Sequence, residues 1–215
     1  MNLREMPALR IGDLEAKIPI IQGGMGVGIS LSGLASAVAD EGGIGIISTA
    51  GIGMLEPDFN SNFSEANQRA LRKEIKKARQ MTTGIIGVNI LVACSDVYDL
   101  LQVAVDEGAD LAFLGAGLPL RIPEKLLLDE SGRARIKVVP IVSSARAAEI
   151  IFRSWKKKYN HVPDAVVVEG PMAGGHIGFK KEQIDNPDYM LEKILPEVIS
   201  AIKLHEHHFN RSIPV

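Results

Sequence analysis

Residues 18–26 of the chain read IPIIQGGMG, an apolar and mostly β-branched run that passes directly into glycines. Such a run predicts a buried β-strand, and the glycines predict a tight turn at its end. Ser30 follows where a helix N-cap is expected, ahead of a helical pattern that includes Leu31, Leu34 and Val38. The stretch therefore predicts a strand, a glycine loop and a helix, which together form one unit of a parallel α/β sheet.

The same alternation continues along the rest of the chain. Short apolar runs and longer segments of helical period follow one another, and this order is typical of βαβ units. Further strands are expected at residues 44–48, 84–91, 109–114, 138–142 and 165–169. Helices are expected at residues 31–38, 64–80, 96–105, 144–155 and 189–202, with a less regular connection over 119–137. Residues 213–215, an apolar Ile-Pro-Val, predict the beginning of a seventh strand.

Six strands of this kind fit either an open, doubly wound sheet or most of a (β/α)8 barrel. Glycine or polar residues stand at the ends of the first, second, third, fourth and sixth strands. A barrel builds its site from several strand ends at once, whereas an open sheet concentrates its site at one switch point. We therefore expect residues 1–215 to form a single α/β domain of the TIM-barrel type. Because a closed barrel needs about 250 residues, we expect an incomplete one, with six βα units, the start of a seventh strand and exposed edges.

The composition narrows the classes of partner. Apolar residues make up 46% of the 215 residues, which excludes an intrinsically disordered chain. Lys and Arg number 24 against 26 Asp and Glu, so a net charge of -2 provides no general attraction to nucleic acid or to an anionic membrane. The N-terminal residues are charged, no apolar run is long enough to span a membrane, and Cys94 is the single cysteine. These features predict a cytoplasmic protein that binds a small molecule, with a homo-oligomer as the candidate assembly.

Residues 169–178 read EGPMAGGHIG and follow a very apolar strand. Glycines allow a planar ligand or a phosphate to approach the backbone, and their N–H groups can form an anion-binding nest. We therefore expect Glu169, Gly174 and Gly175 to contact a ligand, with His176 beside it. Imidazole, with an ordinary pKa of about 6.5, exchanges protons readily around neutral pH. The alternatives are a mobile surface loop with an exposed histidine, and a solvated Glu169 at the strand edge.

The glycines after the first strand form a second candidate site. Gly24 and Gly26 do not continue into the G-x-G-x-x-G spacing of a dinucleotide-binding turn, because Ile29 occupies the last position. The loop can still offer backbone N–H groups and the Gln22 amide to a heteroaromatic ring, and a tight turn without a ligand is the alternative. Asn89 is a polar residue within an apolar strand, so it is either a ligand contact or a structural hydrogen-bonding residue.

Other candidate groups favour structural roles. Cys94 is expected to be a small buried hydrophobic residue rather than a nucleophile, since no nearby residue identifies itself as an activating base. His205, His207 and His208 are expected at a solvated helix end, so no metal site is predicted. The basic cluster around Trp155 is expected to be solvated rather than a surface for nucleic acid.

Three motifs together resemble a known family. Residues 19–26 (PIIQGGMG), 87–89 (GVN) and 173–176 (AGGH) occur in the order and at distances that fit the nitronate monooxygenase family, formerly called 2-nitropropane dioxygenases. The resemblance extends from about Ile11 to Val215. The FMN-dependent enoyl-acyl-carrier-protein reductases are close relatives of that family.

The resemblance implies a TIM-barrel flavoprotein that holds FMN at the C-terminal mouth of the barrel. The positions that match the family's FMN contacts are Gly23, Gly24, Met25, Asn89, Glu169 and Gly174. The first three correspond to residues that line the isoalloxazine ring. His176 corresponds to the family's catalytic histidine.

In function, the resemblance implies an FMN-dependent oxidoreductase that oxidises nitronates or nitroalkanes with dioxygen as the acceptor. In such an enzyme His176 would remove the α-proton of a neutral nitroalkane, while a nitronate would not need that step. An NAD(P)H-dependent enoyl-thioester reductase, with His176 as the proton donor, is the alternative enzyme. A non-catalytic flavin-binding barrel fragment is the alternative of another class.

Overall fold

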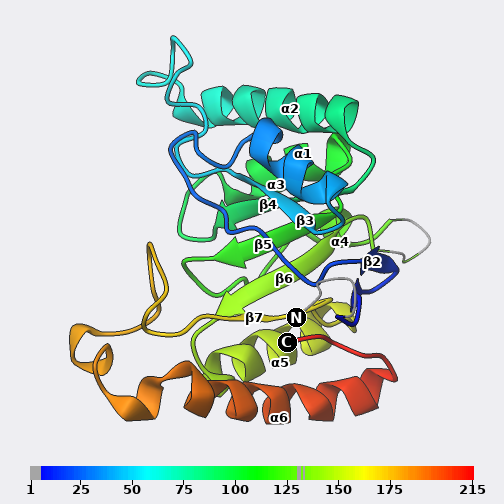
Figure 1. The fold of residues 1–215 in the computed structure, drawn as a ribbon, viewed down its shortest axis with the longest axis vertical. Helices are drawn as coiled ribbons and strands as arrows, with labels where there is room; N and C mark the ends of the chain where they lie inside the picture. Colours follow the sequence, from blue (N-terminus) through cyan, green and yellow to red (C-terminus); the bar gives the residue numbers. More distant parts are fainter. Residues whose placement is uncertain (1–5, 130–131, 133) are drawn as a thin grey trace.

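The computed structural model describes residues 6–129, 132 and 134–215, and its centre is a curved parallel sheet (Figure 1). Each strand of this sheet pairs with the next one along the sequence, and a helix lies in every crossover. The strands are β3 (Ile44–Ser48), β4 (Ile85–Leu91), β5 (Leu111–Gly115), β6 (Lys137–Val142) and β7 (Val167–Val168). A doubly wound sheet would reverse its strand order at a switch point, so the sheet is a half-barrel of the predicted TIM-barrel type.

Helices cover the outer face of the sheet, where they enclose the larger hydrophobic core. They are α1 (Ser32–Asp40), α2 (Phe63–Met81), α3 (Val97–Asp106), α4 (Glu124–Leu127), α5 (Ala145–Tyr159) and α6 (Leu191–Phe209), with two short 3-10 turns, η2 (Lys181–Gln183) and η3 (Pro187–Tyr189). The long helix α6 lies along α5 at the bottom of the view in Figure 1. The predicted alternation of strands and helices is therefore confirmed, with boundaries that differ by a few residues.

The inner face of the sheet carries a second, smaller core. Ile46 from β3 and Phe113 from β5 belong to it. An antiparallel hairpin near the N-terminus, β1 (Leu9–Ile11) and β2 (Leu14–Ala16), contributes Ile11 to the same cluster. The sequence did not predict this hairpin, because strands of three residues are too short to show a period of two.

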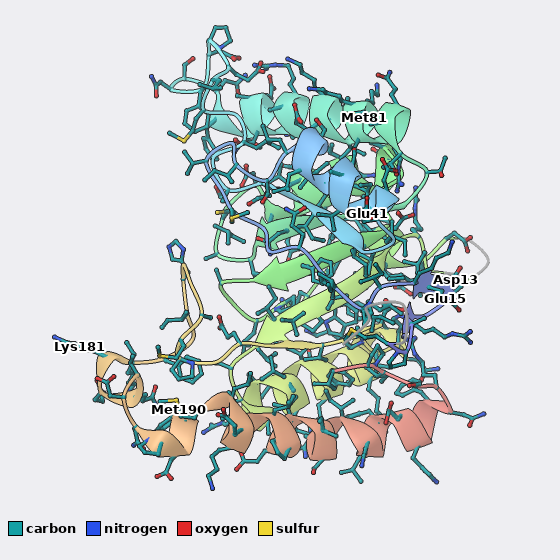
Figure 2. The ribbon with its side chains drawn as sticks, viewed as in Figure 1. Asp13, Glu15, Glu41, Met81, Lys181 and Met190 are labelled. Carbon is teal, nitrogen blue, oxygen red and sulfur yellow. The ribbon has the colours of Figure 1, made fainter. Side chains whose placement is uncertain are left out.

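The hairpin closes the half-barrel at the N-terminal ends of its strands. Figure 2 labels Asp13 and Glu15 of the hairpin on the same side as Glu41, which follows α1, and Lys181 on the opposite side. Lys137 at the start of β6 forms a 2.6 Å ion pair with Asp13, and its hydrogen bond lowers the pKa of the Asp13 carboxyl. The C-terminal strand ends are left free for a site.

The first predicted strand is present only as a short extended segment. Ile21 forms an isolated parallel bridge with Ile44, and the Gln22 N–H donates to the Ile44 carbonyl at 3.0 Å. Ile44 N also donates to the Ile20 carbonyl at 2.9 Å, and Ile18 N donates to the Gly42 carbonyl at 3.0 Å. The expectation of a regular strand over residues 18–22 is therefore wrong in length, although the segment runs beside β3.

The predicted helix starts differ in how they are capped. For α5 the sequence offers Ser143 or Ser144 as the cap, and the structure has Ser144, whose Oγ accepts a hydrogen bond from Ala147 N at 3.2 Å. Ser30 is not the N-cap of α1, because its side chain is buried in the preceding turn. Asp96 occupies the cap position of α3 without a side-chain capping bond, and its carboxylate instead accepts a 2.8 Å hydrogen bond from the Asn67 amide.

The two borders of the half-barrel remain apart, as predicted. An apolar groove of about 400 Å³ lies between the Ile21 segment and β7. The Pro214 carbonyl accepts a hydrogen bond from Val166 N at 2.9 Å, so residues 213–215 run where the seventh strand is predicted. In the structure they form no regular strand.

Within the described residues of 119–137, the predicted irregular connection, the structure has the four-residue helix α4 and an isolated bridge between Leu128 and Ala134. Residues 130, 131 and 133 of this connection, and residues 1–5 of the charged N-terminal stretch, lie outside the described part of the chain. No helix among the described residues is both long and apolar enough to cross a membrane.

Candidate functional site

The C-terminal ends of the strands surround a cavity of about 510 Å³, a volume typical of ligand pockets. Predicted site residues from three separate stretches of the sequence meet there, namely Gly23, Gly24, Met25, Asn89, Glu169, Gly174, Gly175 and His176. The remaining lining residues are Gly26, Ala50, Leu91, Gly115, Ala116 and Ile141. Of the nine residues singled out from the sequence, the cavity therefore brings together all but Gln22.

The turn after the first segment packs closely against its neighbours, which explains two of its glycines. A Cβ on Gly24 would lie 2.5 Å from Asn89 Cβ, and a Cβ on Gly26 would lie 2.9 Å from the Ala50 carbonyl oxygen. Only glycine permits these approaches without displacing the backbone. Gly23 differs, because no heavy atom lies within 4 Å of a Cβ placed on it. The turn thus combines a packed side with an open one.

Ser30 and Gln22 hold this turn from within. Ser30 Oγ accepts a 3.0 Å hydrogen bond from Met25 N and donates to the Gly23 carbonyl at 3.1 Å. Gln22 Nε2 donates to Ser30 Oγ at 2.9 Å and to the Ile46 carbonyl at 3.0 Å. These contacts occupy the Gln22 amide, and Gln22 does not line the cavity. The structure thus shows the Gln22 amide bonded within the turn, while its contact with a bound ring stays a prediction.

Asn89 brings an unpaired amide to the cavity. Its backbone carbonyl accepts hydrogen bonds from Thr49 N and Thr49 Oγ1, both at 3.0 Å. Its half-buried side-chain amide has no hydrogen-bond partner within the described residues. Ser48, paired in register with Asn89 on the neighbouring strand, has a buried Oγ that is also without a partner there. The Asn89 amide lines the cavity and is therefore free to offer a donor and an acceptor to a bound ligand.

Glu169 follows β7 and is half-buried. Its Oε1 accepts a 3.0 Å hydrogen bond from Gly178 N. Burial raises the pKa of the Glu169 carboxyl above its ordinary value, and the hydrogen bond from Gly178 opposes part of this rise. The carboxyl also borders a second cavity of about 320 Å³, which Ser143 and His176 line as well.

His176 belongs to the loop that follows β7. This loop lies on the side to which the strand arrows point in Figure 1. Its imidazole is exposed and lines both cavities. The preceding Gly175 has φ of 85°, a conformation that other residues rarely adopt. The exposure agrees with a surface loop, yet the histidine shares its cavity with Asn89 and Gly24. An imidazole at the edge of a ligand cavity can exchange a proton with a bound substrate and then with solvent.

Several lining residues were not singled out from the sequence. Leu91 and Gly115 end β4 and β5, Ala116 follows with φ of 52°, and Ile141 lies in β6. The rule that barrels build sites at C-terminal strand ends could have indicated Gly115 and Ala116. Nothing in the sequence distinguishes Leu91 or Ile141 from ordinary core residues.

The weaker candidates lie outside the cavity. Cys94 is exposed, so the prediction of a buried cysteine is wrong. Partial desolvation and the Asp96 carboxylate raise the pKa of its thiol, which disfavours a nucleophile. His205 is buried, 3.1 Å from Glu149, so the prediction of a solvated helix end is wrong for this residue. The residues with described positions include no group of three or more His, Cys, Asp or Glu arranged to hold a metal ion.

Known proteins resemble this chain in sequence. The profile of the family described as nitronate monooxygenase matches residues 9–215. An octahydro-indene carboxyl-CoA dehydrogenase from Mycobacterium tuberculosis is 28% identical over 160 residues, which are 74% of this chain and 38% of the relative. The dehydrogenase of the same name from Rhodococcus jostii is 27% identical over 186 residues, which are 86% of this chain and 42% of the relative.

Solved structures resemble it in fold. FabK from Thermotoga maritima is 31% identical with a TM-score of 0.61, and the match covers 85% of this chain and 47% of that one. A nitroalkane oxidase from Streptomyces ansochromogenes has a TM-score of 0.62 at 20% identity, with 85% of this chain and 56% of that one covered. This chain spans about half, or less, of the length of the relatives it matches. With its sequence matched over nearly the whole chain, the protein belongs to the nitronate monooxygenase family.

Proposed function

We propose that this chain binds FMN in the larger cavity and oxidises nitronates or nitroalkanes, with dioxygen as the electron acceptor. The observation that carries this proposal is the meeting of His176, the unpaired Asn89 amide and two glycine turns in one cavity. FMN, when bound, supplies a ring system that accepts two electrons from a substrate. The family match over residues 9–215 supports the same chemistry.

The walls of the cavity fit a flat, partly polar ring. A Cβ placed on Gly23, Gly174 or Gly175 would have no heavy atom within 4 Å, so a planar ligand can lie against these backbone segments. The Asn89 amide offers both a donor and an acceptor to polar ring atoms. We therefore assign the FMN contacts to Gly23, Gly24, Met25, Asn89, Glu169, Gly174 and Gly175.

His176 acts on the substrate rather than on the ring. It removes the α-proton of a neutral nitroalkane and passes it to solvent, which its exposed imidazole can reach. A nitronate has already lost that proton and needs no base. Comparing turnover of the nitroalkane with turnover of the nitronate therefore distinguishes proton removal by His176 from the redox step.

The first experiment is reconstitution of the purified chain with FMN, followed by the visible spectrum. Oxygen consumption is then measured with propionate 3-nitronate, with alkyl nitronates and with the matching nitroalkanes. His176→Gln is expected to lower turnover of nitroalkanes by about 10²–10⁴-fold and to spare turnover of preformed nitronates. His207→Gln, which changes an exposed histidine of α6, is the matched control. Flavin binding without turnover of either form contradicts the proposal and supports the non-catalytic alternative.

A second candidate is NAD(P)H-dependent reduction of an enoyl thioester, with His176 donating a proton. Two observations favour it, namely the 31% identity with FabK and the relatives named as carboxyl-CoA dehydrogenases. Oxidation of NAD(P)H that depends on an added enoyl thioester, without consumption of a nitronate, would replace the first candidate with this one.

A further inference from the structure

The loop that carries His176 is closed at its base by two side chains. The loop begins at Glu169, at the end of β7, and comes back beside Glu169 at Gly178. Glu169 Oε1 accepts a 3.0 Å hydrogen bond from Gly178 N, and Ser143 Oγ donates a 3.3 Å hydrogen bond to the Gly178 carbonyl. One residue, Gly178, is therefore held through both its N–H and its C=O, by side chains that come from two different strand ends.

The packing around Gly178 is as specific as its hydrogen bonds. A Cβ on Gly178 would collide with Ser143 Oγ and would lie 3.2 Å from Glu169 Oε1. Only glycine can therefore occupy the space between the two side chains without displacing one of them. We call Glu169, Ser143 and Gly178 the loop clamp.

The rest of the loop has few attachments of its own. Among the described residues, the remaining hydrogen bonds of this loop join Glu169 N to the Val142 carbonyl at 2.9 Å and Ala173 N to the Gly170 carbonyl at 3.0 Å. The side chains from Met172 to His176 are exposed, and no neighbouring side chain bonds to the imidazole within the described part. The position of His176 is thus set mainly by the two ends of its loop.

The clamp also adjoins the space where His176 acts. Glu169, Ser143, Gly178 and His176 line the 320 Å³ cavity together, and Glu169 and His176 also line the larger one. Burial raises the pKa of the Glu169 carboxyl, so the hydrogen bond from Gly178 stabilises a carboxylate that its surroundings disfavour. Glu169 therefore has a partner that orders the loop, in addition to any contact with a bound ring.

We infer that Glu169 and Ser143 are positioning residues, which fix the Gly178 end of the loop and thereby hold the His176 imidazole at the cavity. The ordering of the loop is a property of the chain alone. Its consequence for proton abstraction rests on the proposed function. The two parts can therefore be tested separately.

The first test measures amide hydrogen exchange of Gly178 in the full chain. Glu169→Ala removes the acceptor, and Glu169→Asp retains the charge but withdraws it by one methylene. Both are expected to speed exchange at Gly178 about tenfold, the effect of losing one hydrogen bond to a charged group. Glu169→Gln, which keeps an acceptor oxygen, is expected to restore most of the protection, and Glu182→Gln, an exposed carboxylate in η2, serves as the control. Wild-type exchange in both the Ala and the Asp variants would overturn the clamp.

The second test compares nitroalkane with preformed nitronate at saturating FMN. Ser143→Ala, which removes the other hydrogen bond of the loop clamp and leaves the assigned FMN contacts in place, is expected to lower kcat for the nitroalkane about three- to tenfold, with KM within twofold of wild type and nitronate turnover retained. Ser143→Thr, which keeps the hydroxyl, is expected to recover most of the lost kcat. Equal losses on both substrates would overturn the role in positioning His176. If the wild-type chain turns over neither substrate, the proposed function fails, while the exchange measurement still decides whether the clamp orders the loop.

Discussion

Gly24→Ala tests whether the first glycine turn is shaped by contact with β4. The added Cβ would lie 2.5 Å from Asn89 Cβ and 2.8 Å from Asn89 Cγ. Carbon atoms in contact normally stay about 3.5–4.0 Å apart, so the turn and the strand must separate by about 1 Å. The nearest atom, Asn89 Cβ, is fixed to the backbone, and rotation of the side chain does not move it away.

The size of the effect follows from this geometry. Overpacking of a well-packed site destabilises a protein by about 1–3 kcal/mol. For a domain of this size, each kcal/mol lowers the melting temperature by about 2–4 °C. We therefore expect Gly24→Ala to lower the Tm of the chain by about 2–12 °C and to weaken its affinity for FMN. Gly23→Ala is the matched control, with an expected change within about 0.5 kcal/mol, because space beside Gly23 is open.

A double-variant comparison identifies the contact. Asn89→Gly removes the Cβ that Gly24→Ala would strike, whereas Asn89→Ala keeps it. Gly24→Ala is therefore expected to cost almost nothing further in the Asn89→Gly background and its full amount in the Asn89→Ala background. Urea unfolding, followed by the fluorescence of the single, buried Trp155, measures the difference. Equal rescue by both backgrounds, or an unchanged Tm in Gly24→Ala alone, would refute the reasoning.

Three other outcomes follow from the same structure. Gln22→Ala is expected to lower the free energy of unfolding by about 1–3 kcal/mol in urea titrations, since it leaves buried partners of the amide unpaired. Burial lowers the pKa of His161 below 6.5, so the unfolded chain binds a proton more readily than the folded one. Stability should then be full above about pH 6.5 and fall as the pH drops towards the folded pKa, and thermal melts of His161→Gln should show a weaker dependence in this range. Gly45→Ala should prevent folding or lower the Tm strongly because its Cβ would overlap the backbone of α1, whereas Gly33→Ala, in open space on α1, should stabilise by about 0.5–1 kcal/mol.

The strands and long helices could be predicted because their signals are local. Residues 44–48 form β3 as predicted, and the helix expected at 64–80 is α2 at Phe63–Met81. Apolar runs and helical periods report directly which face of a segment is buried. The barrel type of the sheet was predicted from the glycine or polar residues at several strand ends, and the strand order of the structure agrees with it. The segment 18–22 was predicted less well, because it forms a single bridge with β3, at Ile21, rather than a regular strand.

The support of the candidate site could not be predicted in the same way. Gln22 has the residue type and the position of a ligand contact, yet its amide binds Ser30 and the Ile46 carbonyl. Ser30 itself has the pattern of an N-cap and is instead buried beneath the turn. The surroundings of both residues depend on partners that are distant in sequence, since a short-range pattern does not reveal which polar group lies across the fold. For Asn89 the sequence leaves a ligand contact and a structural hydrogen bond open, and the structure shows its side-chain amide without a partner among the described residues.

The glycines of the site serve two different purposes that look identical in sequence. At Gly24, Gly26 and Gly178 an added Cβ would meet neighbouring atoms closely, so these glycines let the walls of the cavity approach one another. At Gly23 and Gly174 it would meet nothing, although both residues line the same cavity. Selection for folding alone explains the first group, because larger residues there strain the chain itself. It does not explain the second group, where a methyl group would cost the chain little. A flat ligand lying against the backbone would account for glycine at these two positions, which line the cavity, whereas Gly33 has the same open space but lies outside it.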